Sequence, residues 1–336
     1  MKVLAPGKLI LSGEHSVVYG QPALAMAVNR YVTVTATPQF TPHISFDLTD
    51  FAYQSRLSLT ALDNLKNRIK QKYKRFLKGD YTIRRVLHKP VELAQVAFTL
   101  FVESLNIKLT QGINIHMEST IPVGCGMGSS AATVLSIAHA IANYLEVDLS
   151  SEMFLRLGLE AENLQHGYSS GLDLRVSLHG GCIYLNDNQV SLRPAPTFPM
   201  YLINTGLPET TTGVCIEAAA PYFKTSHIAD DFAAVTNAMD AALLNGSLQN
   251  IKLAIHENHN LLTQIKVVPT VVNQFITEVE NYGGAAKICG AGAVAGNNAG
   301  VVLVITDDEH SLAELCARYQ YSLLPIQCEA RGVHVV

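Results

Sequence analysis

The stretch "IPVGCGMGSSAAT", Ile121 to Thr133, constrains the fold of this chain more than any other segment. It follows "GINIHMES" at 112–119, where apolar residues alternate as they do in a half-buried strand. After it, apolar residues recur at helical spacing from Val134 to Leu145. The local order is therefore a strand, a glycine-rich loop and a helix.

The same two periodicities place further elements along the chain. Pro6-Gly7 predicts a turn between two short strands, so that the chain opens in a hairpin-like way. The remaining predictions are strands at 28–38, 182–185, 200–203, 286–289 and 300–305, and helices at 152–165, 228–244, 253–266, 311–319 and, with breaks at 79–80 and 90, across 57–105. A length of 336 residues fits two domains. The turn "NDNQ" at 186–189 predicts their boundary, which gives domains of 1–187 and 188–336.

Composition excludes some classes of protein. Hydrophobic residues make up 48% of the chain and charged residues 15%, which indicates a large buried core and excludes a disordered chain. A formal net charge of -4 gives no reason to expect a nucleic-acid partner. However, ten of the 24 lysines and arginines fall between Lys66 and Lys89. This basic segment is either a solvated helix face or a rim that attracts an anionic substrate.

Cysteine usage and apolar runs bear on location. None of the six cysteines forms a CxxC pair or has metal-ligand spacing, so we expect reduced, mostly buried thiols and a cytoplasmic protein. Pro6, Gly7 and Lys8 interrupt the N-terminal apolar residues, which predicts no signal peptide. No apolar run reaches about 18 residues, so we expect no membrane-spanning segment.

The glycine-rich stretch has the composition of a phosphate-binding loop. A helix N-terminus offers unpaired N–H groups, and Gly124, Gly126 and Gly128 would let the backbone close around a phosphate. Ser129 and Ser130 stand where an N-cap is expected, so they could cap the helix, bind a metal ion or do both. The spacing matches neither a P-loop nor a dinucleotide-binding fingerprint. The alternative is a tight turn followed by an ordinary serine cap.

Three other segments add polar groups beside glycines. They are "APGKLILSGEHSVVYGQPALA" at 5–25, "ENLQHGYSSGLD" at 162–173 and "KICGAGAVAGNNAG" at 287–300. Glycine-rich loops with few charges of both signs indicate a phosphorylated ligand together with a metal ion.

These segments resemble the motifs of the GHMP-type small-molecule kinases. The opening "PGK…GEH.VVYG" and the stretch "PVGCGMGSSAA" carry the resemblance, and within the family the opening is most like that of the mevalonate kinases. The resemblance implies an α/β (α+β) fold of two domains, with an N-terminal domain like ribosomal S5 domain 2, a ferredoxin-like C-terminal domain and the active site between them. Homodimers are common in the family.

The resemblance also implies the reaction and its co-substrate. ATP with Mg²⁺ phosphorylates a substrate hydroxyl, and the leading expectation is the conversion of mevalonate to 5-phosphomevalonate for isoprenoid synthesis. The residues expected at the ATP phosphates are Pro122, Gly124, Gly126, Met127, Gly128, Ser129, Ser130 and Ala131.

Catalytic and metal-binding roles follow from the same motifs. Asp173 corresponds to the family's catalytic aspartate and Lys8 to its N-terminal lysine. The expected magnesium ligands are Ser130 and Glu162, with Glu160 as an alternative to the latter. Phosphoryl transfer depends mostly on positioning and charge neutralisation, which suits these residue types.

The resemblance also implies a set of contacts with the acceptor. Glu14, His15 and Thr205 are expected to bind it together with Lys8 and Asp173, and the threonines at 210–212 lie in the same segment as Thr205. A hydroxy-acid acceptor needs a cation for its carboxylate. Either Lys8 or a residue of the basic segment could supply that cation.

Two departures from the family pattern leave alternatives open. Ser169 stands where the family usually has proline, and the last glycine loop reads "GAGAVAGNNAG" where a run of glycines is usual. The alternatives are a phosphomevalonate kinase, another small-molecule or sugar kinase of the family, and a catalytically silent homologue that senses a ligand.

Overall fold

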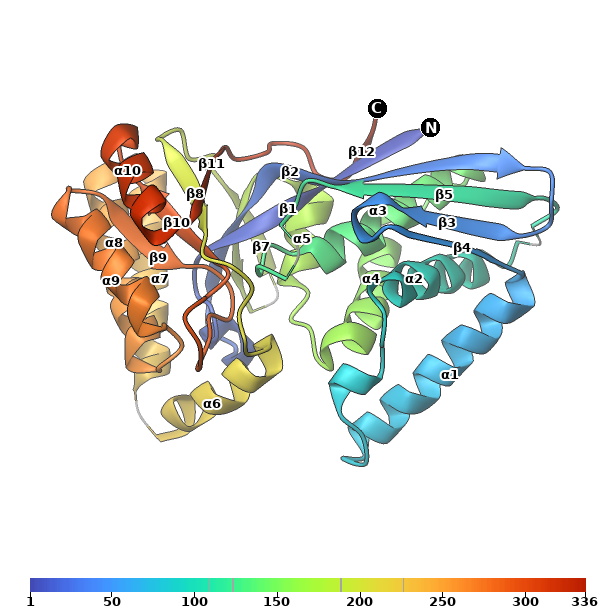
Figure 1. Ribbon diagram of the computed structural model, residues 1–336, viewed down its shortest axis with the longest axis horizontal. Helices are drawn as coiled ribbons and strands as arrows, with labels where there is room; N and C mark the ends of the chain where they lie inside the picture. The colour runs from blue at the N-terminus through green and yellow to red at the C-terminus, as the bar shows by residue number, and fades with distance from the viewer. Residues whose placement is uncertain (108, 123, 188, 226) are drawn as a thin grey trace.

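The computed structural model in Figure 1 describes residues 1–107, 109–122, 124–187, 189–225 and 227–336. Within these residues the strands form two sheets, one of eight strands and one of four. We call the first sheet and its helices the N-terminal unit, and the second sheet and its helices the C-terminal unit. This mixed α/β architecture with two sheets confirms the predicted fold class.

The strands of the N-terminal unit do not lie in chain order within their sheet. Its path is β12-β1-β2-β5-β3-β4, with β6 paired to β2 and β7 paired to β6. The described pairs are antiparallel except β3 with β5. The strands are β1 (Lys2–Ser12), β2 (Ala23–Gln39), β3 (Ile44–Leu48), β4 (Tyr53–Leu57), β5 (Gly112–Ser119), β6 (Cys182–Asn186), β7 (Gln189–Arg193) and β12 (His334–Val335).

Helices fill the connections of this unit. They are α1 (Leu59–Leu77), α2 (Pro90–Leu105), α3 (Ser129–Tyr144), α4 (Ser151–His166) and α5 (Leu172–His179), with short 3₁₀ turns η1 (Ser16–Tyr19), η2 (Thr49–Phe51) and η3 (Ile83–Arg85). Helix α3 packs on β1 and β2, and α2 and α4 pack against α3. Nearly every residue of α3 from Ala131 to Ala142 is buried, because its sequence is apolar or small on all sides. The glycine-rich loop therefore leads into a helix that is buried along most of its length.

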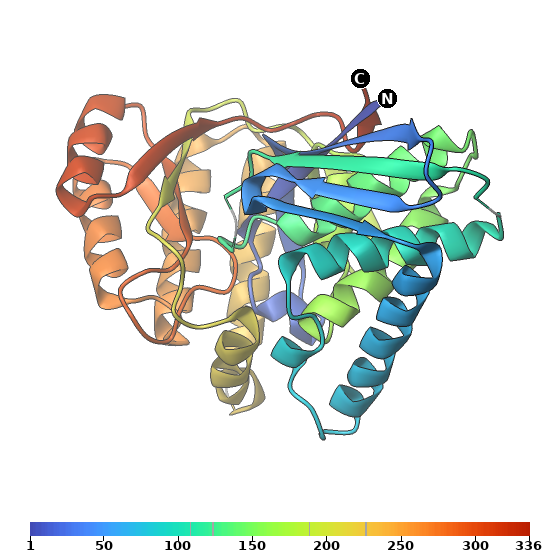
Figure 2. The same cartoon turned by 45° about the vertical axis from the view of Figure 1, so that its right-hand side comes forward.

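Helix α1 has the opposite character and projects from the core. Its buried residues are Leu62, Lys66 and Ile69, and its remaining lysines and arginines are half-buried or exposed. Figure 2 shows α1 and η3 projecting on the same side of the molecule as α6 of the C-terminal unit.

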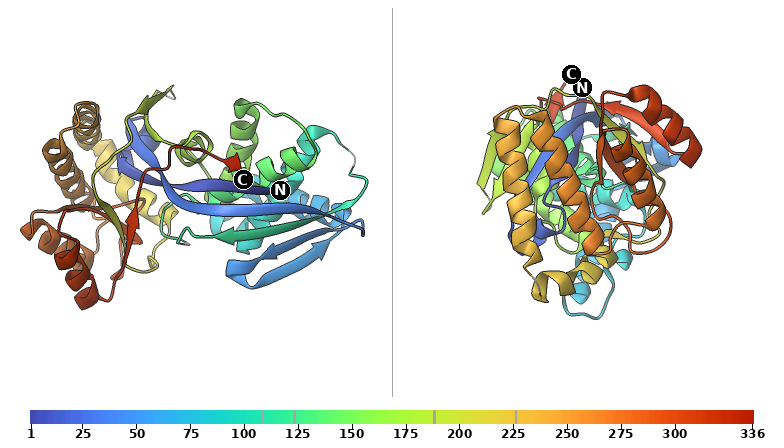
Figure 3. Two further views of the ribbon diagram at one scale, coloured as in Figure 1. Left: turned by 90° about the horizontal axis from the view of Figure 1, so that it is seen from above. Right: turned by 90° about the vertical axis from the view of Figure 1, so that its left-hand side faces the viewer.

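The C-terminal unit has strand order β11-β8-β10-β9, with all neighbouring strands antiparallel. This order and the succession of elements are those of a ferredoxin-like fold, with extra helices between the first two strands. Its elements are β8 (Met200–Asn204), α6 (Thr212–Thr225), α7 (Ile228–Leu244), α8 (Leu248–Gln264), α9 (Thr270–Asn281), β9 (Ala285–Ile288), β10 (Val301–Ile305), α10 (Glu309–Tyr319) and β11 (Ser322–Ile326). Figure 3 shows α7, α8 and α9 side by side at one end of the molecule.

The predicted hairpin-like opening is wrong. β1 is one strand from Lys2 to Ser12, paired along its length with β2. Pro6-Gly7 instead marks a shift of register in that pairing. A proline lacks the N–H that a ladder needs, so an irregularity in the strand accommodates it without a turn.

The predicted domain boundary falls between residues 187 and 188, and residue 188 lies outside the described residues. On either side of it, β6 and β7 pair with each other, so residues 189–193 belong to the N-terminal unit. The last strand, β12, also returns to pair with β1. Both chain ends therefore lie close together at one edge of the first sheet (Figure 1).

Two sequence predictions concern burial. Five of the six cysteines are buried and Cys328 is half-buried. In the described part of the chain, no helix has both the length and the apolar character needed to cross a lipid bilayer.

Candidate active site

Lys8 and Asp173 form an ion pair where β1 meets the start of α5. The Lys8 Nζ lies 3.1 Å from Asp173 Oδ1. The lysine side chain is 5% exposed and the aspartate side chain 30% exposed, so a substrate can reach the carboxylate while the ammonium group lies behind it. The backbone N–H of Lys8 donates to the Met127 carbonyl at 2.9 Å, which ties β1 to the glycine-rich loop.

Gly128 brings that loop against the ion pair. It takes the left-handed conformation, with φ of 69°, and is the N-cap of α3. A Cβ atom here would lie 2.8 Å from Lys8 Cγ and 3.4 Å from Asp173 Oδ2. The predicted serine cap is wrong, because the helix begins at Ser129 and no side chain caps it. The hydroxyl of Ser130 is thus available for another partner.

Ser130 meets two side chains of α4. His166 Nε2 lies 3.1 Å from Ser130 Oγ and 3.9 Å from Glu162 Oε2. Glu162 is 2% exposed, and its Oε1 has no hydrogen-bond partner among the described residues. Burial raises the pKa of Glu162, and the nearby charge of Asp173 adds to this, while His166, Ser130 and Lys8 oppose it.

The structure separates the two carboxylates that were candidates for a metal ligand. Glu160 forms a surface ion pair with Lys70, at 2.7 Å between Nζ and Oε1. Residues two apart on a helix point in different directions. Glu162 therefore lies on a different face of α4 from Glu160, and this face meets Ser130. Of the two, Glu162 has the geometry for the role.

Ser130 and Glu162 fit a magnesium ion. A hydroxyl oxygen and a buried carboxylate with an unpartnered oxygen are the kind of ligands that Mg²⁺ accepts. Among the described residues no cluster of three or more His, Cys, Asp or Glu side chains could enclose a metal ion. An ion held here would therefore take its other ligands from nucleotide phosphates and water.

Glu14 and His15 are bound to the C-terminal unit. The Glu14 carboxylate forms an ion pair with Lys287 of β9. His15 Nε2 lies 3.0 Å from the carbonyl oxygen of Ala291. Both residues are nearly inaccessible to solvent, and burial lowers the pKa of His15 to about 4. Their expected contact with an acceptor stays a prediction, and the structure adds that they join the two units.

The last glycine loop, residues 289–300, packs against the first. A Cβ atom on Gly126 would lie 3.3 Å from the Cys289 carbonyl oxygen and 3.4 Å from the Cα of Gly290. The hydroxyl of Thr205 donates to the Gly300 carbonyl and accepts from the Ala299 N–H, each at 2.9 Å. Thr205 thus fixes the end of this loop. Its predicted contact with the acceptor remains untested.

The remaining residues predicted at the phosphates line the same turn. Pro122 is half-buried, Gly124 is exposed, and Met127 and Ala131 are buried. Gly124 faces the C-terminal unit, since a Cβ atom there would lie 2.9 Å from Leu207 Cδ2.

Two side chains of the site received no role from the sequence. His166 lies four residues after Glu162, and that spacing on a helix was a usable signal that both reach Ser130. Lys287 is fully buried. A lysine within the apolar run "AAKIC" requires a partner of opposite charge, which was the signal for a buried ion pair.

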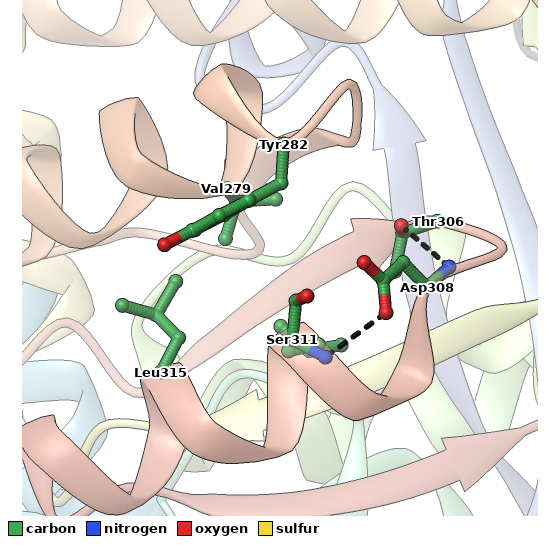
Figure 4. A pocket seen from close by; sticks show the side chains of 7 residues that line it. Val279, Tyr282, Thr306, Asp308, Ser311 and Leu315 are labelled. Atoms are coloured by element: carbon green, nitrogen blue, oxygen red, sulfur yellow. Dashed lines mark hydrogen bonds between the residues drawn. The ribbon is translucent and has the colours of Figure 1, made fainter.

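A small cavity of about 10 Å³ lies elsewhere in the C-terminal unit (Figure 4). It is lined by residues of α9 and α10 and by the turn after β10, including Val279, Tyr282 and Ser311. Its size allows about one water molecule. None of its lining residues belongs to the glycine loops, so it is separate from the site.

Comparison with known proteins agrees with the site. Residues 92–181 match the family model for the GHMP kinases N terminal domain, a span that includes Ser130, Glu162 and Asp173. The mevalonate kinase of Thermococcus onnurineus is 28% identical over 304 residues, with 87% of each chain covered. Residues 92–181 therefore form a GHMP kinase N-terminal domain, and the similarity to mevalonate kinases extends over most of the chain. Together these matches indicate an ATP-dependent phosphotransferase that acts on a small molecule.

Solved structures confirm the fold over the whole chain. The crystal structure of Methanococcus jannaschii mevalonate kinase has a TM-score of 0.82 at 21% identity, with 98% of both chains covered. Lactococcus lactis galactokinase complexed with galactose has a TM-score of 0.77 at 13% identity, with 100% of this chain and 95% of that chain covered. Kinases named for different substrates thus share this fold, so the fold by itself leaves the acceptor open.

Proposed function

We propose that this GHMP kinase transfers the γ-phosphoryl group of ATP to the 5-hydroxyl of mevalonate, giving 5-phosphomevalonate and ADP. The observation that supports the reaction type is the ion pair between Lys8 and the accessible Asp173. Gly128 of the glycine-rich loop lies against both side chains. The relatives named mevalonate kinases, matched over most of the chain, support the choice of acceptor.

In this proposal, Asp173 takes the proton of the acceptor hydroxyl. In the transfer, a bond forms between the hydroxyl oxygen and the γ-phosphorus, and the bond from that phosphorus to the ADP oxygen breaks. The hydroxyl proton passes to the Asp173 carboxylate. A positioned base of this kind contributes about 10²–10⁴-fold in rate.

Lys8 and the start of α3 stabilise charge. The Lys8 ammonium group lies beside Asp173 and neutralises negative charge on the transferring phosphoryl group. The first N–H groups of α3 lack a side-chain cap, so they can donate to nucleotide phosphates. A magnesium ion held by Ser130 and Glu162 would supply further charge neutralisation at the phosphate oxygens. A homodimer, which light scattering of the purified chain would test, belongs to the same proposal.

The test is ADP release by the purified protein with Mg-ATP and one acceptor at a time. Mevalonate, phosphomevalonate, galactose and homoserine form the panel. We expect turnover with mevalonate, and a loss of about 10²-fold or more in the Asp173→Asn variant. Asp231→Asn, at an exposed position on α7, is the matched control and is expected to keep full activity.

Each other outcome has a definite meaning. Turnover with a different acceptor would replace mevalonate and keep the kinase reaction. ATP binding without phosphorylation of any acceptor would favour the second candidate, a catalytically silent ligand sensor. The altered 289–300 loop is the feature that favours that candidate.

A further inference from the structure

Within the described residues, one arginine of the basic segment joins the two units without a carboxylate partner. The basic segment at 66–89 forms the projecting part of α1, the loop after it and η3. Lys66 is buried and pairs with Glu103 at 2.8 Å, and Lys70 pairs with Glu160. Arg84 instead donates from Nη2 to the hydroxyl of Thr211, 127 residues away in the C-terminal unit, at 2.8 Å. This contact joins the two units.

On the N-terminal side, Arg84 is connected to the loop that leads into α5 and Asp173. The Tyr73 hydroxyl donates to the Gly167 carbonyl at 2.8 Å. Ile83, next to Arg84, lies against the same glycine, since a Cβ atom on Gly167 would be 3.5 Å from Ile83 Cγ1. The segment around Arg84 therefore packs on the start of the chain that leads to Asp173.

On the C-terminal side, Thr211 is connected to the 289–300 loop. Its neighbour Thr210 accepts a hydrogen bond from the Val294 N–H at 3.2 Å. That loop in turn meets His15 through the Ala291 carbonyl oxygen. The contact between Arg84 and Thr211 thus closes a ring of contacts that contains Lys8, Asp173 and His15.

The basic side chains at this ring of contacts differ in their partners and in their exposure to solvent. Lys8 is paired with Asp173, and Lys287 is fully buried against Glu14. His15 is neutral near pH 7, because burial lowers its pKa to about 4. Among the described residues, Arg84 has no ion-pair contact with a carboxylate, and its guanidinium group is exposed and bonded to a neutral hydroxyl.

We infer that Arg84 binds the carboxylate of the acceptor. On binding, its guanidinium group gives up the hydrogen bond to the Thr211 hydroxyl and donates to that carboxylate instead. This inference rests on the proposed function, in which the acceptor is a hydroxy acid. A guanidinium group offers parallel N–H donors that match both oxygens of a carboxylate. A charged acceptor is a stronger partner than the hydroxyl, so binding would favour the exchange.

Steady-state kinetics of Arg84→Gln test the inference. We expect the KM for mevalonate to rise by about 10- to 100-fold, as for the loss of a hydrogen bond between charged groups. The kcat and the KM for ATP are expected to stay within about twofold, because Arg84 is not assigned to the chemical step or the nucleotide. Arg85→Gln is the matched control. Arg85 is the next residue, is also exposed, and is expected to leave all three parameters unchanged.

A neutral acceptor separates charge recognition from a structural role. The probe is the triol in which a primary alcohol replaces the carboxylate of mevalonate. We expect Arg84→Gln to leave the KM for the triol unchanged, and Arg84→Lys to recover part of the affinity for mevalonate. An equal rise of KM for mevalonate and the triol would overturn the inference and make Arg84 a structural link between the units.

The proposed function and this inference fail in different ways. If wild-type protein does not turn over mevalonate, the proposed acceptor is wrong and Arg84 loses its assignment. If wild-type protein turns over mevalonate and Arg84→Gln has an unchanged KM, the acceptor stands and the assignment of Arg84 alone is wrong. Thr211→Val provides a further check. Removing the competing hydroxyl is expected to leave the KM for mevalonate equal or lower.

Discussion

Lys287 and Glu14 form an ion pair that joins β9 of the C-terminal unit to the turn after β1, with both side chains withdrawn from solvent. The ammonium group also donates to the Ile10 carbonyl at 3.3 Å. Burial raises the pKa of Glu14, and the charge of Lys287 opposes that shift. The other carboxylate oxygen, Oε2, is buried without a hydrogen-bond partner in the described structure. The pair therefore ties the end of β1 and the turn after it to the strand that leads into the 289–300 loop.

Removing one member of this pair is expected to destabilise the protein severely. Lys287→Met leaves the Glu14 carboxylate buried without a counter-charge, which costs about 3–5 kcal/mol. The double variant with Glu14→Gln removes both charges and is expected to recover most of that loss. Urea denaturation measures both. Lys252→Met, at a half-exposed lysine of α8, is the control and is expected to change stability by at most about 0.5 kcal/mol. Equal instability of the single and double variants would contradict the charge argument.

His15 predicts an acid-sensitive stability. Its folded-state pKa of about 4 lies below the ordinary value of 6.5, so between these values the unfolded chain binds more protons. Stability is fully present above pH 6.5 and falls by about 3 kcal/mol as the pH drops to about 4. Urea denaturation from pH 7 to pH 4.5 is expected to show a smaller decrease for His15→Gln than for wild type.

A second histidine, half-buried in α3, separates the pH dependence of stability from an effect on the active site. His139, stacked on Phe154, also has its pKa lowered to about 4 by burial. His139→Phe is expected to reduce the pH dependence of stability as well, but to leave kinase activity unchanged because His139 lies in α3 away from the site residues. Identical pH profiles for wild type and His15→Gln would show that the pKa of His15 does not differ between the folded and unfolded states.

Local patterns in the sequence predicted much of the fold. The alternation at 112–119 and the apolar spacing after Val134 identified β5 and α3, because each pattern matches the burial of one element. The hairpin-like opening failed because Pro6 is accommodated by a register shift inside β1. Likewise, β12 returns from the far end of the chain to pair with β1, which no local pattern indicates.

The candidate site was predictable only where motifs carried it. Lys8 and Asp173 came from separate motifs, and the structure brings them to 3.1 Å. The partners that act across the units were missed. Arg84 had no signal of its own among ten neighbouring basic residues, because its partner Thr211 lies 127 positions away. Contacts of this kind depend on how the two sheets are packed, and periodicity carries no information about that.

Metal binding should distinguish two glutamates of α4. Glu162→Gln removes the buried carboxylate that faces Ser130, so Mn²⁺ binding to the protein–ATP complex is expected to weaken by about 10-fold or more. Electron paramagnetic resonance of free Mn²⁺ measures this without turnover. Glu160→Gln is the control, since Glu160 pairs with Lys70 on the surface, and it is expected to stay within about twofold. Equal weakening by both variants would remove Glu162 from the metal site.

Gly128 should be the glycine where a methyl group does the most harm to catalysis. Gly128→Ala places Cβ 2.8 Å from Lys8 Cγ, so the Lys8 side chain must shift from its present position beside Asp173. A displacement of about 1 Å at a reacting group lowers kcat by about 10²-fold. Gly79→Ala is the matched control, because Gly79 also has a positive φ, of 81°, but has open space where Cβ would be. Both variants carry about 1–2 kcal/mol of backbone strain, which thermal unfolding measures. Only Gly128→Ala is expected to lose kcat, and equal kcat in the two variants would show that the loop does not position the ion pair.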